Sequence, residues 1–160
     1  EDVQYDNIFI KYDLVADQVI ITPNDQGGLF IALFSPRVKE FSFSGMKIVR
    51  FTKTNFGAGM PEGFYQELAT GKVKAYTKTM KFLEEKVDIT GISRRFDQRV
   101  RHYIFKDGKY HVIRNKKTLL SVLKEHKREV QQYLGSLKMK YKYNPEQNIT
   151  AAVNIYNQSN

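Results

Sequence analysis

Short runs in which apolar and polar residues alternate fill the first two thirds of the chain, as β-strands with one buried face do. In VKEFSFSGMKIVRF, two such runs flank Ser44-Gly45, and a two-residue hairpin there places Phe43 opposite Met46. The same alternation predicts earlier strands at 7–15, 17–22 and 28–34.

Two further hairpins are predicted by turns that end in glycine. Asp-Gly favours a type I′ turn because both residues tolerate positive φ, so the turn at 107–108 places Phe105 opposite Tyr110. The Thr-Gly pair in GFYQELATGKVKAYTK predicts a hairpin of the same kind, in which Tyr65 faces Tyr76. The stretches NFGAGMPEG and DITGISRR are predicted to be loops.

Helical periodicity appears late, in NKKTLLSVLKEHKREVQQYLGSL. Asn115 is the expected N-cap and Gly135 can end the helix, while a thinner apolar stripe near Glu125 predicts a break. The stripe consists of Leu119, Leu120, Leu123, Val130 and Leu134. KMKYKY alternates and predicts an extended segment. NPEQNITAAVNIYN then predicts a last helix, with Asn144 as its cap and Pro145 in its first turn.

Together these elements predict an α+β fold, in which a mostly antiparallel β meander, curled into a roll or a two-layer sandwich, is covered by C-terminal helices. We interpret residues 1–160 as one domain with a β-rich part at 1–114 and a helical part at 116–157. A chain of 160 residues can bury a sizeable core without cross-links, and it contains no cysteine. No apolar run approaches the roughly 18 residues that a membrane span needs.

The net charge of +9 is spread unevenly. Residues 1–70 carry six basic and nine acidic side chains, residues 71–142 carry twenty and seven, and Glu146 is the one charged residue after that. A basic face of this kind can meet a polyanion, and it can equally be a solvated lysine-rich surface.

The candidate anion or partner surface is the basic cluster within 94–117, where arginines and lysines alternate with aromatic residues. Its members are Arg94, Arg95, Arg99, Arg101, Arg114, Lys116 and Lys117. The aromatic residues between them share one hairpin face, which is also the pattern of a core face, and we favour core packing for them.

Other chemistry finds little support in the sequence. Gly57, Gly59 and Gly63 do not have the spacing of a phosphate-binding loop, and no Gly-Lys-Ser/Thr follows them. His102 and His111 fall on one face of the predicted hairpin, but no third metal ligand accompanies them. No catalytic constellation, cofactor-binding motif or metal site is therefore predicted.

YIFKDGKYHVIRNKKTLLSVLKEHKREVQQYL, with GFYQELATGKVKAYTK before it and YNPEQNITAAVNIYN after it, resembles a pattern of uncharacterised exported or envelope proteins of Bacteroidota. The resemblance covers roughly residues 60–157. It implies a removed signal peptide and a location in the periplasm or at the cell surface, and it brings no known activity.

The expected function is therefore a non-enzymatic binding or interaction module of the cell envelope. Its expected partner is an envelope protein, a glycan or another anionic ligand, and it needs no cofactor. The alternative is a nucleic-acid or polyanion binder that uses the 94–117 cluster, although an exported protein rarely meets nucleic acid.

Overall fold

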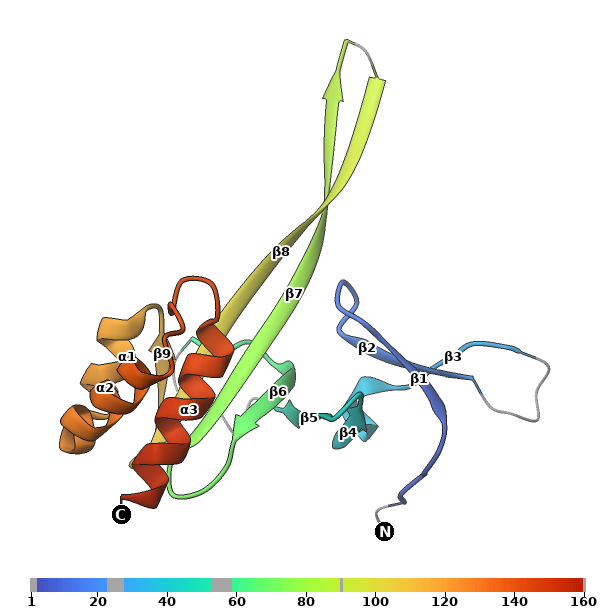
Figure 1. Cartoon of the computed structure of the whole chain (residues 1–160). Helices are drawn as coiled ribbons and strands as arrows, with labels where there is room; N and C mark the ends of the chain where they lie inside the picture. The colour runs from blue at the N-terminus through green and yellow to red at the C-terminus, as the bar shows by residue number, and fades with distance from the viewer. Residues whose placement is uncertain (1–2, 23–27, 53–58, 90, 160) are drawn as a thin grey trace.

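The computed structural model describes residues 3–22, 28–52, 59–89 and 91–159. These residues form a three-stranded antiparallel sheet in the order β1-β2-β3 and a six-stranded antiparallel meander in the order β4-β5-β6-β7-β8-β9, followed by the helices α1, α2 and α3 (Figure 1). The predicted α+β class, with antiparallel strands before C-terminal helices, is confirmed.

The strands are β1 (Phe9–Asp13), β2 (Gln18–Thr22), β3 (Ile31–Ala32), β4 (Glu40–Phe43), β5 (Met46–Phe51), β6 (Gly63–Ala69), β7 (Lys74–Asp88), β8 (Gly91–Lys106) and β9 (Lys109–Ile113). The helices are α1 (Lys116–Val122), α2 (Lys127–Ser136) and α3 (Pro145–Gln158), with short 3-10 turns at Ser35–Arg37 and Lys124–His126. The first three predicted strands are present, but the third is reduced to two residues.

Two of the three predicted hairpin registers are confirmed. Phe43 pairs with Met46 across the Ser44-Gly45 turn, and Phe105 pairs with Tyr110 across the Asp107-Gly108 turn. Asp107 and Gly108 have φ values of 50° and 73°, as the type I′ turn requires. The turn residues and the alternation of the runs beside them therefore predicted these two registers correctly.

The register predicted for the hairpin at 70–71 is wrong. Tyr76 pairs with Glu67 rather than with Tyr65, because Ala69 pairs with Ala75 and the strands are therefore joined by residues 70–74 instead of by two turn residues. The cause lies in α3: the Asn157 side chain accepts a hydrogen bond from the Val73 N–H (2.9 Å) and donates to the Val73 carbonyl (2.9 Å). This contact holds a wider connection than a two-residue turn.

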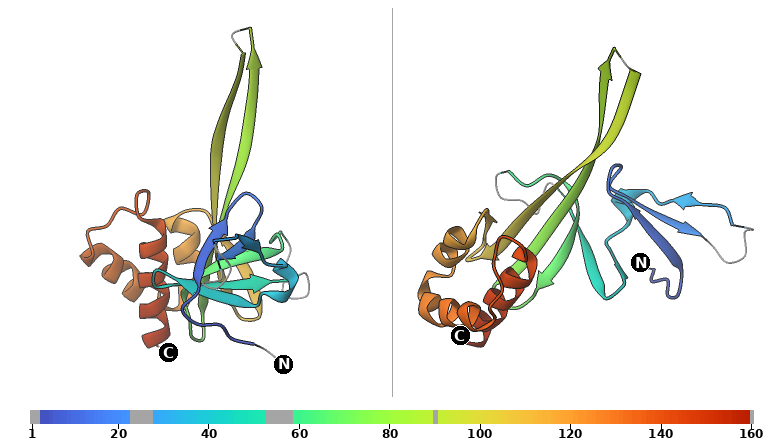
Figure 2. Two further views of the ribbon diagram at one scale, coloured as in Figure 1. Left: turned by 90° about the vertical axis from the view of Figure 1, so that its right-hand side faces the viewer. Right: turned by 45° about the horizontal axis from the view of Figure 1, so that its top comes forward.

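The predicted loop in DITGISRR is also wrong, because β8 begins at Gly91 and the stretch belongs mostly to a long hairpin. β7 and β8 pair without interruption from Lys74↔Phe105 to Asp88↔Gly91. The hairpin projects far from the rest of the molecule in all three views (Figures 1 and 2). The outer parts of β7 and β8 are exposed to solvent and mix charged with apolar residues. They therefore contain fewer apolar residues than a core strand, and the sequence pattern did not identify them.

The helices cover one face of the sheet at the base of this hairpin. α3 packs against β6 and β7, and α1 packs against β9. Ala75, Ile104 and Ile113 meet the buried helix residues there, and all five residues of the predicted apolar stripe are buried. The Asn115 side chain caps α1, and a 3-10 turn at Lys124–His126 separates α1 from α2, as predicted.

Three local predictions about the helical part need correction or qualification. Residues 138–143 do not form an extended segment, because a turn occupies residues 141–143. α2 continues through Gly135 to Ser136. Asn144 stands at the N-cap of α3 without a side-chain capping bond, and the Asn144 carbonyl instead accepts a hydrogen bond from the Asn148 side chain (2.7 Å).

The opposite face of the six-stranded sheet buries aromatic residues. Tyr65, Tyr76 and Tyr103 pack there with Phe51 and Met60, which confirms that aromatic residues of the basic stretch serve the core. A third cluster, around Val19, Ile48 and Phe64, joins the three-stranded sheet to β4, β5 and β6.

Candidate functional site: a protruding β-hairpin arm

The outer part of the β7–β8 hairpin, residues 80–99, is the most distinctive surface of the molecule, and we call it the arm. β6 pairs with β7 only up to Thr77, and β9 pairs with β8 only from His102. In the described part of the chain, the arm strands therefore pair with each other alone beyond Lys81. An isolated two-stranded ribbon is marginally stable in water, so an additional contact would stabilise it.

One face of the arm is apolar. The register pairs Leu83 with Phe96 and Val87 with Ile92, and the two-residue period of a strand places all four side chains on the same face. Their exposed fractions are 47% for Leu83, 65% for Phe96, 73% for Val87 and 63% for Ile92, and Ile89 at the tip is fully exposed. We call these four residues the apolar face.

Charged side chains on the arm are largely paired with one another. Arg94 donates to Glu85 (2.6 Å) within the apolar face, between its two apolar layers. On the opposite face, Arg95 donates twice to Glu84 (2.9 and 2.7 Å). Arg99, also on that face, lies 3.5 Å from Asp97. These guanidinium groups therefore already have carboxylate partners within the arm.

The seven basic residues of the predicted cluster are all exposed but occupy different parts of the fold. Arg94, Arg95 and Arg99 lie on the arm, Arg101 lies at its base, and the remaining three lie where β9 enters α1. Those three are Arg114, Lys116 and Lys117. Arg94 and Arg101 are seven residues apart in an extended strand, so about 23 Å separates them.

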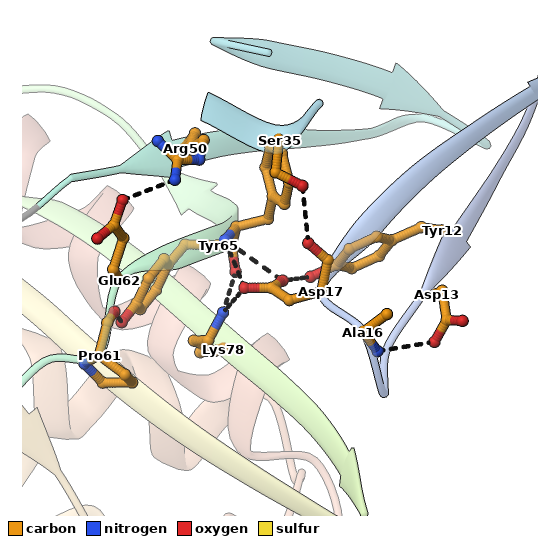
Figure 3. A network of polar contacts seen from close by, with 11 residues as sticks. Tyr12, Asp13, Ala16, Asp17, Ser35, Arg50, Pro61, Glu62, Tyr65 and Lys78 are labelled. Atoms are coloured by element: carbon orange, nitrogen blue, oxygen red, sulfur yellow. Dashed lines mark hydrogen bonds and ion pairs between the residues drawn. The ribbon is translucent and has the colours of Figure 1, made fainter. Parts of the chain in front are cut away.

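At the base of the arm, the three-stranded sheet is fastened to β7 through a network around Asp17 (Figure 3). Lys78, whose side chain is 3% exposed, donates to the Asp17 carboxylate (2.8 Å) and to the Phe64 carbonyl (3.2 Å). Asp17 also accepts a short hydrogen bond from the Tyr12 hydroxyl and a longer one from the Phe64 N–H (3.4 Å). Burial, reinforced by Asp17, raises the pKa of Tyr12, so its hydroxyl stays protonated as a donor.

This network lies at the point where the pairing between β6 and β7 ends. The N–H and carbonyl of Phe64 bond to Asp17 and Lys78 side chains, and these bonds replace the strand pairing that ends at Thr77. Farther along β7, the Lys81 N–H donates to the Leu14 carbonyl (3.0 Å). The turn between β1 and β2 thus takes over from β6 as the neighbour of β7.

Gly63 is required by the same network. Its φ is 130°, and a Cβ there would lie 1.8 Å from an Asp17 carboxylate oxygen and 2.6 Å from the Lys78 nitrogen. Gly57, another of the three glycines considered for phosphate binding, lies outside the described residues. The role visible for Gly63 is thus to let Asp17 reach the backbone of β6.

An open groove of about 240 Å³ lies beside this junction and reaches the apolar face. Phe96 of the arm forms one wall, and Leu14 and Val15 of the β1–β2 turn form another. A second pocket of about 300 Å³ lies beneath Tyr12 and Phe43. The apolar surface of the arm is therefore continuous with an apolar depression at its base.

The two histidines considered for metal binding do lie on one face, since His102 pairs with Ile113 and His111 pairs with Ile104. His102 is buried and its Nδ1 lies 2.8 Å from the Thr77 hydroxyl, and burial lowers its pKa. Within the described residues, no group of three or more His, Asp or Glu side chains could hold a metal ion.

A second polar cluster joins the sheet to the helices. Lys106 donates to Glu125 (2.9 Å), and its ion pair holds the pKa of the Glu125 carboxyl at about 2. The Tyr156 hydroxyl donates to the other Glu125 oxygen (3.3 Å). The cluster therefore fastens the turn at 107–108 and α3 to the break between α1 and α2.

No protein-family model, curated protein or solved structure matches the chain. Among the helices of the described residues, none is both long enough and apolar enough to cross a membrane.

The sequence held signals for both features that it did not predict. Lys78 lies two residues after Tyr76, so in a strand both side chains are on the same face, which is the face of the buried aromatic residues. A buried lysine is costly unless a carboxylate pairs with it, so a partner could have been expected. In the arm, Leu83, Val87, Ile92 and Phe96 alternate with charges on both sides of Gly91. That symmetry is readable once Gly91 is placed next to a turn rather than inside a loop.

Proposed function

We propose that this chain is a non-enzymatic interaction module of the cell envelope and that the apolar face of the arm is its binding surface. The observation that carries the proposal is the 47–73% exposure of Leu83, Val87, Ile92 and Phe96 on a strand pair that projects from the body. Large apolar side chains that gather on one exposed face in this way mark a site of interaction.

The distribution of charge favours an apolar partner over a polyanion. Arg94, Arg95 and Arg99, three of the seven basic residues of the 94–117 cluster, are already close to carboxylates. A nucleic acid or an acidic glycan would have to compete with these intramolecular pairs. A partner that buries the apolar face can leave them in place.

The polar clusters of the body support a binding role for the arm by keeping its base rigid. Asp17 and Lys78 fasten the three-stranded sheet to β7, and Lys106 and Glu125 fasten the helices to β8. A rigid base lowers the entropy that is lost when the arm engages a partner. The envelope location rests on the resemblance to exported proteins of Bacteroidota.

Site-specific photo-cross-linking tests the proposal in cells that express the full gene product. A photoreactive residue replaces Phe96 on the apolar face or, as a matched control, Ser93 on the opposite face. We expect a discrete adduct from position 96 and none from position 93, in the envelope fraction. Adducts from both positions alike, or from neither, would overturn the proposed binding surface, and recovery in the cytoplasmic fraction would overturn the location.

A further inference from the structure

The arm is almost neutral although the chain is strongly basic. Residues 80–99 carry five basic and four acidic side chains, a net charge of +1, so the rest of the chain holds +8. Two copies that approach through their bodies would repel each other, whereas two arms would not. The contact between two nearly neutral arms therefore adds little repulsion of its own, and screening in physiological salt weakens the repulsion between body charges more than about 8 Å apart.

The apolar face is self-complementary across one particular symmetry axis. From base to tip its layers are Leu83 with Phe96, then Glu85 with Arg94, then Val87 with Ile92. A two-fold axis along the arm, lying between two facing copies, places β7 of one copy over β8 of the other. Leu83 then faces Phe96, Val87 faces Ile92, and Glu85 faces Arg94 of the other copy.

This arrangement matches apolar layers with apolar layers and each charge with its opposite. Glu85 and Arg94 already form an ion pair within one arm (2.6 Å), and the second copy would extend it to four alternating charges. A two-fold axis perpendicular to the arm would instead place Glu85 of one copy over Glu85 of the other. The charge pattern therefore favours arms that point in the same direction, with their tips together.

The exposed area is enough for a specific dimer. Taking roughly 170 Å² for a fully exposed apolar side chain, the exposed fractions of the four apolar-face residues and Ile89 leave on the order of 600 Å² open on each copy. A contact that covers all of it would bury about 1,200 Å² in two copies, which meets the lower limit of the range of specific protein interfaces.

We propose that the occupant of the apolar face is a second copy of this chain, bound face to face with its arm parallel and its tip at the same end. This inference rests on the proposed function, because it names the partner of the same surface. It also accounts for a marginal two-stranded ribbon, since pairing converts two exposed ribbons into a four-stranded sandwich with a covered core.

Sedimentation velocity of the purified chain, from low micromolar to several hundred micromolar, tests the proposal. We expect a monomer–dimer equilibrium in wild type, weakened at least about 30-fold by Phe96→Glu, the loss typical of a large aromatic residue that anchors an interface. Ser93→Glu adds the same charge on the opposite face and should leave the equilibrium unchanged. A wild-type monomer at every concentration would overturn the proposal, as would equal effects of the two variants.

A charge-swapped variant, Glu85→Arg with Arg94→Glu, tests the orientation. The swap preserves the ion pair within each arm, so the variant should still dimerise with itself. Mixed with wild type it should form fewer heterodimers than random assortment gives, because like charges then face each other. Preferential heterodimers would overturn the parallel arrangement. If the chain is monomeric but position 96 still cross-links to another envelope protein, the second-copy inference fails and the proposed function survives.

Discussion

Replacing Asp17 by alanine should destabilise the protein more than the loss of any exposed ion pair. Asp17 gathers three donors: the Lys78 ammonium (2.8 Å), the Tyr12 hydroxyl and the Phe64 N–H (3.4 Å). The Lys78 side chain is 3% exposed, so without Asp17 its charge stays buried, and among the described residues the Phe64 carbonyl is the hydrogen-bond acceptor that remains. Water cannot readily replace the carboxylate there.

The magnitude follows from the burial of the two partners. Removing one partner of a fully buried ion pair costs about 3–5 kcal/mol. The Asp17 side chain is 30% exposed, so some water can enter its place, and we expect the lower end, about 3 kcal/mol. In a chain of this length, that corresponds to a fall in Tm of about 6–12 °C.

Urea unfolding followed by circular dichroism, with thermal melts as a second measure, gives the free energies. The matched control is Asp97→Ala, which removes a carboxylate from the exposed pair with Arg99 and should cost less than about 1 kcal/mol. In a Lys78→Met background, Asp17→Ala should cost far less, because no buried charge is then left beside Asp17. An equal cost of Asp17→Ala with and without Lys78 would refute the argument, as would a loss no larger than that of the control.

Three further predictions concern the turn, the buried histidine and the basic residues. Gly108 has a φ of 73°, so Gly108→Val should cost more than about 1 kcal/mol, and an unchanged Tm would contradict the type I′ turn. Burial lowers the pKa of His102 below its unfolded value of about 6.5, so the unfolded state binds more protons in acid. Stability should therefore be complete above about pH 6.5 and fall as the pH drops below it, and this part of the pH dependence should vanish in His102→Gln. Binding of heparin or single-stranded DNA near physiological salt should be no tighter than about 10⁻⁴ M. A triple variant replaces Arg99, Arg101 and Arg114 by alanine. Submicromolar binding by wild type that is lost in this variant would favour the polyanion alternative.

The elements that the sequence predicted correctly are governed by neighbours in the chain. The Asp107-Gly108 turn needs positive φ at both residues, and a two-residue turn at that point predicts the observed register of β8 against β9. Asn115 finds the Thr118 N–H three residues away, at 2.9 Å. Such features depend on a few adjacent residues, so a single sequence contains them.

The features that the sequence did not predict depend on contacts between distant segments. The Asn157 side chain binds the backbone of Val73, 84 residues away in the sequence, and holds the connection between β6 and β7. No local sequence pattern predicts this contact. Asp17 meets Lys78 across 61 residues. The arm was not predicted for a different reason. Both faces of its strands are exposed and both carry charged residues, so its sequence does not show the regular apolar–polar alternation that distinguishes a half-buried strand from a loop.

Thiol accessibility in intact cells tests most directly whether the apolar face is covered by a partner. The chain has no cysteine, so Phe96→Cys and Ser93→Cys each provide a single thiol, on opposite faces of the arm. Labelling by a small maleimide is measured in cells and in dilute purified protein. The account predicts that position 96 reacts at least about tenfold more slowly in cells than in dilute solution, a protection worth about 1.4 kcal/mol, while position 93 reacts equally in both. Equal labelling of position 96 in the two settings would contradict the account.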